Sequence, residues 1–222
     1  MWLIDSSIGR KVVMSVSGAA LILFLTFHMA MNCVALFSEE GYNMVCEFLG
    51  ANWYALVGTA GLAFLVLVHF VYAFWLTIQN QKARGSQKYA VTEKPKSVEW
   101  ASQNMLALGI IVFIGLAVHL MNFWSKMQLQ EIMGTQSAIA APTDGAAFIK
   151  YTFSKWYYVV IYTVWLCALW FHLSHGFWSM LQTIGWNNAL WQKRLEVISK
   201  IYTTVLVLGF LAVVYMFFIK SL

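Results

Sequence analysis

The stretch SGAALILFLTFHMAMN, residues 17–32, has no charged side chain and decides the class of fold. Arg10 and Lys11 precede it, and the apolar run that follows them covers about 25 residues, enough for a helix to cross a bilayer. Because this run is longer than the core of a cleavable signal peptide, we expect a first membrane helix that is retained. Its one histidine, His28, suggests a function, since a histidine inside a membrane span is energetically costly.

The whole chain has the composition of an integral membrane protein. It is 61% hydrophobic and only 10% charged, against about 25% charged in soluble domains. Pro95 and Pro142 both fall between apolar segments, so the spans are free of proline kinks. We expect an all-α fold, a single domain over residues 1–222 that forms a bundle of five transmembrane helices. The expected spans are 12–36, 53–79, 102–126, 155–182 and 199–220.

The cysteines do not form a cofactor motif. Cys33, Cys46 and Cys167 make no CxxC or CxxCH pattern, so neither a covalently attached haem nor a cysteine-ligated iron–sulfur cluster is expected. Free thiols are the expected state, with a Cys33–Cys46 disulfide as the alternative in an oxidising compartment.

The distribution of lysine and arginine predicts the orientation in the membrane. Ten of the fourteen basic residues lie at the N-terminus and in the second and fourth connections: Arg10, Lys11, Lys82, Arg84, Lys88, Lys94, Lys96, Lys193, Arg194 and Lys200. With four acids that side has net charge +6, while four bases and five acids give −1 on the other side. We therefore expect a cytoplasmic N-terminus and a C-terminus outside. The basic cluster at 82–96 is also suited to an acidic partner surface or anionic lipid headgroups.

Four of the spans carry one depth-matched histidine each. Counted at 1.5 Å per residue from the cytoplasmic ends, His28 and His119 lie at about 24–26 Å, and His69 and His172 at about 15 Å. Two imidazoles from facing helices are the axial ligands of a six-coordinate haem. A single histidine is more often a hydrogen-bonded core residue, but four in two matched pairs predict two haems. Zinc would require its ligands to converge at one depth.

His175 competes with His172 for the ligand role, because the two are three residues apart on one helix. His172 matches the depth of His69 better, and we predict His175 nearer the cytoplasm, beside a haem propionate or a quinone. Glycines precede the histidines on the same helices. Gly18, Gly109 and Gly115, together with Gly61, let a porphyrin or a neighbouring helix approach the backbone closely.

The motifs on these helices resemble a known family. Besides SGAALILFLTFHMAMN, the third span reads GLAVHLMNFW and the fourth FHLSHGFWSMLQTIGW, an H-x-S-x-G pattern at His172, Ser174 and Gly176. In their order and spacing they look like the dihaem cytochrome b membrane-anchor subunit of succinate:quinone oxidoreductases, that is succinate dehydrogenases and quinol:fumarate reductases. The resemblance covers nearly the whole chain.

The resemblance implies a set of ligands, cofactors and partners. It assigns His28 and His119 to the outer haem b and His69 and His172 to the inner haem b, with menaquinone or another quinone as the redox partner. It implies a flavoprotein subunit and an iron–sulfur subunit on the cytoplasmic face of a bacterial inner membrane. This chain would anchor them and transfer electrons, without dicarboxylate chemistry of its own. Membrane lipid is the other expected contact, and nucleic acid is not expected.

Quinol oxidation releases protons, so an acid is useful near the outer haem. Glu39, Glu40 and Glu47 lie on that side, and Glu47, closest to the second span, is the predicted proton acceptor; a solvated acidic loop is the alternative. Dihaem cytochrome b subunits of hydrogenases, formate dehydrogenases and nitrate reductases share the bis-histidine logic and are the alternative function. A haem-free transporter with core histidines is the third.

Overall fold

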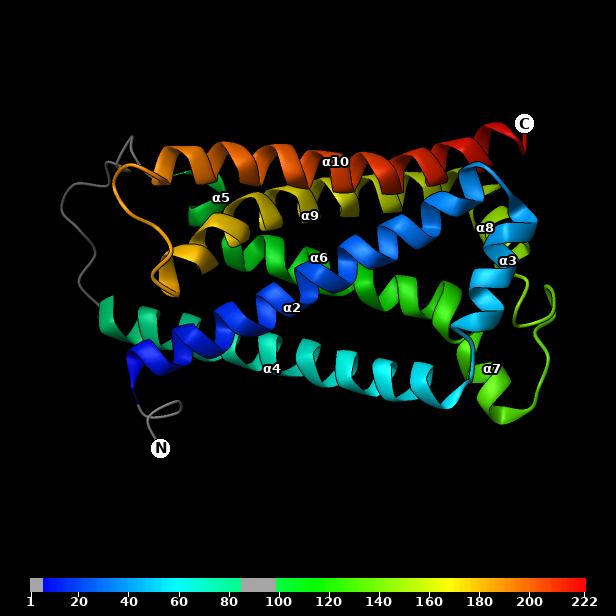
Figure 1. Ribbon diagram of the computed structural model, residues 1–222, viewed down its shortest axis with the longest axis horizontal. Coiled ribbons are helices and arrows are strands. Elements are labelled where there is room, and N and C mark those ends of the chain that lie inside the picture. The colour runs from blue at the N-terminus through cyan, green and yellow to red at the C-terminus, as the bar shows by residue number, and fades with distance from the viewer. Residues whose placement is uncertain (1–5, 85–98) are drawn as a thin grey trace.

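The computed structural model describes residues 6–84 and 99–222, and all regular structure in these two ranges is helical (Figure 1). Five helices are long and apolar enough to cross a membrane, which confirms the predicted number of spans. Their ends lie within five residues of the predicted ones, except that the fifth helix begins at Gln192, seven residues earlier than predicted. They are α2 (Ser7–Cys33) with its extension η1 (Val34–Leu36), α4 (Trp53–Arg84), α6 (Met105–His119) with its extension η2 (Leu120–Trp124), α9 (Trp156–Thr183) and α10 (Gln192–Ile219).

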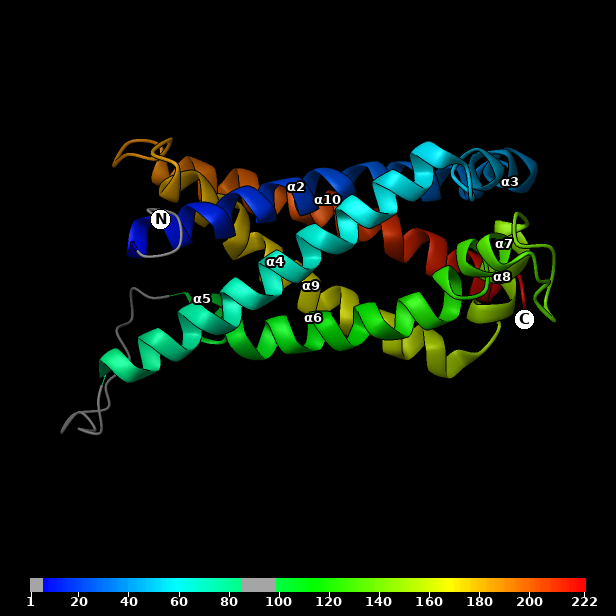
Figure 2. The ribbon, with the colours of Figure 1, turned by 90° about the horizontal axis from the view of Figure 1, so that it is seen from below.

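Short helices gather at one end of the bundle, where the sequence analysis expected only connections. These are α3 (Glu39–Phe48), α7 (Gln128–Met133) and α8 (Gly145–Phe153), and we call this end the capped end (Figures 1 and 2). The opposite end, where α2 begins and where the short α5 (Trp100–Gln103) lies, is called the N-terminal end. Because α10 finishes at the capped end, the chain crosses the bundle an odd number of times, as predicted.

Side-chain caps fix where several helices begin. The hydroxyl of Ser6 accepts a hydrogen bond from the Gly9 amide at 2.9 Å at the start of α2, and Ser38 does the same for Gly41 at the start of α3. Asp144 caps α8 through the Ala147 amide at 3.1 Å. Each cap satisfies a backbone N–H that the helix leaves unpaired. Capping therefore explains why connections that are too short for domains still contain regular helices.

The largest fully buried side chains come from α8 and α10, which pack against α9. Phe148 and Phe217 have no exposed surface, and Ser199 is equally buried because its hydroxyl donates to the Ser174 carbonyl at 2.5 Å. A buried hydroxyl satisfied in this way holds two helices together without the cost of an unpaired polar group. This side of the bundle is thus a conventional packed core.

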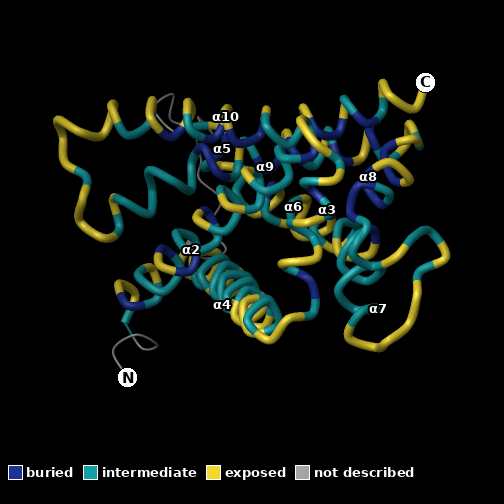
Figure 3. The backbone as a smooth tube through the Cα atoms, turned by 45° about the vertical axis from the view of Figure 1, so that its right-hand side comes forward, coloured by how far each residue is buried: buried dark blue, intermediate teal, exposed yellow. Residues whose placement is uncertain are grey.

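Helix α4 packs very differently. None of its residues between 53 and 83 is buried, and Figure 3 draws it in yellow and teal throughout. Among the described residues it packs along α2 and makes no comparable backbone contact with α6 or α9. Large apolar side chains such as Phe64 and Leu67 are exposed on it, which suits a surface covered by lipid. The contacts of α4 with α6 are therefore made by side chains, such as the stacked rings of Phe70 and Phe113, and not by close backbone packing.

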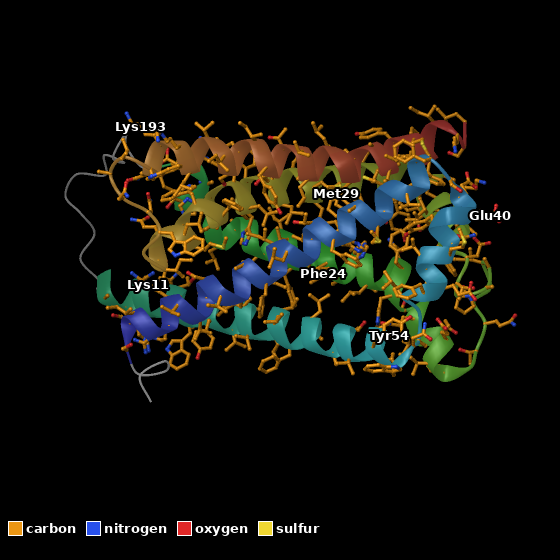
Figure 4. All side chains as sticks on the ribbon, viewed as in Figure 1. Lys11, Phe24, Met29, Glu40, Tyr54 and Lys193 are labelled. Carbon is orange, nitrogen blue, oxygen red and sulfur yellow. The ribbon has the colours of Figure 1, made fainter. Side chains whose placement is uncertain are left out.

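The charged residues follow the predicted asymmetry. Lys11 and Lys193 lie at the N-terminal end and Glu40 at the capped end (Figure 4). Other members of the basic set, Lys88, Lys94 and Lys96, lie outside the described residues, as do Asp5, Glu93 and Pro95. Cys33, Cys46 and Cys167 are free thiols, as expected. Which end faces the cytoplasm stays a prediction.

Candidate functional site

The structure brings together the same histidines that the depth count paired. His28 of α2 faces His119 of α6 with 5.8 Å between ring centroids and an interplanar angle of 85°. His69 of α4 faces His172 of α9 at 6.4 Å and 70°. We call these the first and the second histidine pair. Because His69 contacts α2 eleven residues before His28, the two pairs are separated by about 16 Å along that helix.

The four helices that carry the histidines surround the two pairs, and each pair joins two helices that lie diagonally opposite each other. Helix α2 packs against α4 and α9, and α6 packs against α9, but neither α2 with α6 nor α4 with α9 forms close backbone packing among the described residues. The imidazoles therefore meet across helices whose backbones stay apart. Among the residues described, no cluster of three or more His, Cys, Asp or Glu side chains suited to a metal is found. Each pair thus presents two imidazoles.

Aromatic rings surround the first pair. Phe24 stacks on His28 with centroids 5.4 Å apart, and Phe210 lies at 5.7 Å from the same ring (Figure 4 labels Phe24). Trp165 lies 5.7 Å from His119, and its indole N–H donates to the Val112 carbonyl at 3.0 Å. This second contact ties α9 to α6 next to His119. This packing of aromatic rings limits the movement of both imidazoles and keeps them facing each other.

The backbone changes its winding directly after His119. Residues Leu120–Trp124 form the π-helix η2, and Asn122 within it is buried with its side-chain amide 3.4 Å from the Tyr162 hydroxyl. Single π-turns inside helices are rare and occur frequently at functional sites. The Nδ1 atom of His119 is buried and has no hydrogen-bond partner. The sequence carried no signal for this π-turn.

Small residues surround the second pair. The hydroxyl of Ser17 lies 3.2 Å from Nδ1 of His69. A Cβ atom added to Gly18 would lie 3.5 Å from Cε1 of His69, and one added to Gly109 would lie 3.7 Å from Cε1 of His172. At both positions an added Cβ would make only ordinary van der Waals contact with an imidazole, whereas at Gly115 it would lie 2.0 Å from Cδ1 of Trp165, so Gly115 is the one of these three where a side chain does not fit. Gly61 has no neighbour within 4 Å of such an atom, so the pattern does not extend to it.

His175 lies outside both pairs and takes part in a charged cluster at the N-terminal end. Its Nδ1 is 3.3 Å from the Glu99 carboxylate, which also accepts from Lys200 at 3.2 Å and from the indole of Trp178 at 3.4 Å. Burial raises the pKa of Glu99, but hydrogen bonds from Lys200 and His175 outweigh it and the net pKa is lowered. His172, and not His175, faces His69. The charged cluster was not anticipated, because Glu99 is far from α9 in the sequence.

The capped end holds an open, shallow cavity of about 480 Å³ that includes Glu47. Its lining combines apolar and polar side chains from α3, α7 and the segments that flank them: Met44, Glu47, Phe48, Asn52, Tyr54, Glu131 and Thr143. The carboxylate of Glu131 packs against Gly50, where an added Cβ would lie 2.5 Å from Oε2. Sequence reasoning selected Glu47 but missed Glu131, which is distant in the sequence.

The other two acids on this side have different surroundings. Glu39 lies 3.3 Å from both Lys150 and Lys220, so it joins α3 to the ends of α8 and α10. Burial raises the pKa of Glu39, but its hydrogen bonds to the two lysines lower it further, and the net pKa is lowered. Glu40 is exposed and does not line the cavity. Of the three acids considered from the sequence, only Glu47 lines the cavity.

Comparison of the chain with family models, with curated proteins and with solved structures finds no match. The family resemblance therefore rests on the residues and their spacing.

Proposed function

We propose that this chain is the membrane cytochrome b subunit of a succinate dehydrogenase or fumarate reductase complex, with one haem b held by each histidine pair. The observation that carries the proposal is the placement of two facing imidazole pairs across the two diagonals of the bundle. His28 with His119, and His69 with His172, would hold the two haems, because imidazole is a common protein ligand of haem iron.

The surroundings of the imidazoles fit such ligands. Nδ1 of His119 and Nδ1 of His172 are buried without partners, and no side chain separates the second-pair imidazoles from the helix backbone at Gly18 and Gly109. When bound, haem supplies one-electron redox chemistry. Aromatic rings restrain the imidazoles of the first pair, and the Ser17 hydroxyl contacts His69 of the second pair.

The proposed electron path joins a quinone at the capped end to a soluble partner at the N-terminal end. The cavity beside Glu47 has apolar and aromatic walls for a quinone ring and two carboxylates for its hydroxyl protons. The basic N-terminal end is suited to dock an iron–sulfur subunit with its flavoprotein. Its excess of lysine and arginine also predicts that this end is cytoplasmic.

A reduced-minus-oxidised spectrum of the purified chain tests the haem proposal. We expect b-type absorbance with two haems per chain, and co-purification of a flavoprotein and an iron–sulfur protein from the native membrane. A folded, monodisperse chain without b-type absorbance would overturn the proposal and favour a haem-free transporter with core histidines. A nickel or molybdenum subunit in place of the flavoprotein would assign the chain to another quinone-linked oxidoreductase.

Substitution of the acids tests the quinone site separately. Glu47→Gln removes a proton acceptor, and we expect quinol oxidation by the assembled complex to slow about 100-fold or more, the range for a general base. Glu40→Gln is the matched control, because it lies on the same helix but does not line the cavity. If Glu131→Gln abolished oxidation while Glu47→Gln left it unchanged, the proton acceptor would be Glu131.

A further inference from the structure

We infer that Ser17 is a positioning residue that fixes the tautomer of His69 and thereby sets the electron donation of this ligand. The inference rests on the proposed function, because it concerns how His69 presents its ligand atom to a haem iron. Ser17 is 2% exposed, so its contact with His69 is shielded from water. Neither the family resemblance nor the depth of the histidines assigns Ser17 this role.

Hydrogen-bond geometry around Ser17 determines where the imidazole proton lies. The Ser17 hydroxyl has one proton and donates it to the Met14 carbonyl at 3.0 Å. The same hydroxyl oxygen lies 3.2 Å from Nδ1 of His69 and is then available only as an acceptor. Nδ1 must therefore carry the proton of the neutral imidazole.

This tautomer leaves the other ring nitrogen free. With Nδ1 donating to the Ser17 hydroxyl oxygen, Nε2 keeps its lone pair and is the free ligand atom. The ligand is thus held in both orientation and protonation before any metal binds.

The other three histidines of the two pairs lack this support. Nδ1 of His119 and Nδ1 of His172 have no hydrogen-bond partner, and Nδ1 of His28 lies 3.4 Å from the amide nitrogen of Asn32, itself a donor. Hydrogen bonding to the outer nitrogen of a ligating imidazole raises its basicity and favours the more oxidised metal. We therefore expect the Ser17 contact to lower the midpoint potential of the haem held by the second pair.

Redox titration of Ser17→Ala and Ser17→Thr in a His28→Ala background tests the inference, since only the second-pair haem remains there. We expect Ser17→Ala to raise its midpoint potential, or to weaken haem retention by about 10- to 100-fold, the usual effect of losing such a contact. Ser17→Thr keeps the hydroxyl and should retain both the potential and the haem. Thr is the rescue that separates hydrogen bonding from packing.

Two results would overturn the inference. One is an unchanged potential and haem content in Ser17→Ala, and the other is a Ser17→Thr variant that behaves like Ser17→Ala. Neither result affects the proposed haem binding, which fails if the unsubstituted chain binds no haem. The two failures are therefore distinguishable in one set of spectra and titrations.

Discussion

The two histidine pairs are held by different physical means. Rings hold the first pair: Phe24 stacks on His28, and Trp165 lies against His119. The second pair has Ser17 and two glycines beside it, and a charged cluster one turn beyond His172. Aromatic packing fixes position through shape, whereas a hydrogen bond also fixes protonation. The two proposed haem sites would therefore share the same ligand chemistry but differ in the electron donation of their ligands.

Substitution of a paired histidine should have the largest effect on the proposed haem sites. His28→Ala or His119→Ala should lose the first-pair haem, and His69→Ala or His172→Ala the second, so each variant retains about half of the haem because one axial ligand alone cannot hold a six-coordinate iron. Haem content per chain and the spectrum of the remaining haem measure the effect. His175→Ala is the control and should keep both haems. Loss of the second-pair haem in His175→Ala, with retention in His172→Ala, would contradict the assignment.

Glycine-to-alanine substitutions beside the two histidine pairs should differ in their effect on stability. A Cβ on Gly115 would lie 2.0 Å from Cδ1 of Trp165, whereas one on Gly109 would be in ordinary contact, 3.7 Å from His172. Gly115→Ala should displace Trp165 from His119 and reduce the free energy of unfolding by about 1–3 kcal/mol, the range for overpacking. Gly109→Ala should change it far less. Equal denaturation midpoints for the two variants would show that Trp165 and its neighbours accommodate the added methyl group without loss of stability.

Loss of the Trp165 indole hydrogen bond should have a smaller effect on stability at the same position. Trp165→Phe keeps an aromatic ring near His119 but removes the N–H that donates to the Val112 carbonyl. We expect the free energy of unfolding to fall by about 0.5–1.5 kcal/mol, the usual value of one such bond. Redox titration should find the second-pair potential unchanged. A shift confined to the second pair would mean that the sites are not separate.

Much of this arrangement could be predicted from the sequence, because apolar length and alternating direction are enough to place residues by depth. His28 and His119 are 91 positions apart, yet depth alone predicted that they meet. Rotation of a helix about its axis is not contained in depth. For that reason the Ser17–His69 contact and the outward position of Gly61 were not predictable.

The capped end was predicted least well. Helices α3, α7 and α8 are short, and their residues lie in connections that lack the length signal of a membrane span. Glu131 joins Glu47 at the cavity only because α7 folds back against Gly50, a contact between segments far apart in the chain. Local composition indicated acidic residues on this side, but tertiary contacts decide which of them share a cavity.

The smallest expected effect comes from the charged cluster beyond the second pair. Glu99→Gln removes the ion pair with Lys200, whose side chain is 49% exposed, so solvent screening limits the cost to about 0–1 kcal/mol at neutral pH.

Burial raises the pKa of Glu99, but Lys200 and His175 lower it more, so the net pKa is below the ordinary value of 4.5. A carboxylate with a lowered pKa stabilises the fold above the unfolded-state value, and that stabilisation is lost as the pH falls through the folded-state value. The stability difference between Glu99→Gln and the unsubstituted chain should therefore be present at neutral pH and fade below about pH 4.5. Glu196→Gln on α10, whose amide oxygen can still accept the 3.4 Å hydrogen bond from Gln192, is the matched control. Thermal denaturation across this pH range measures both variants, and a difference that grows on acidification would refute the assigned role of Glu99.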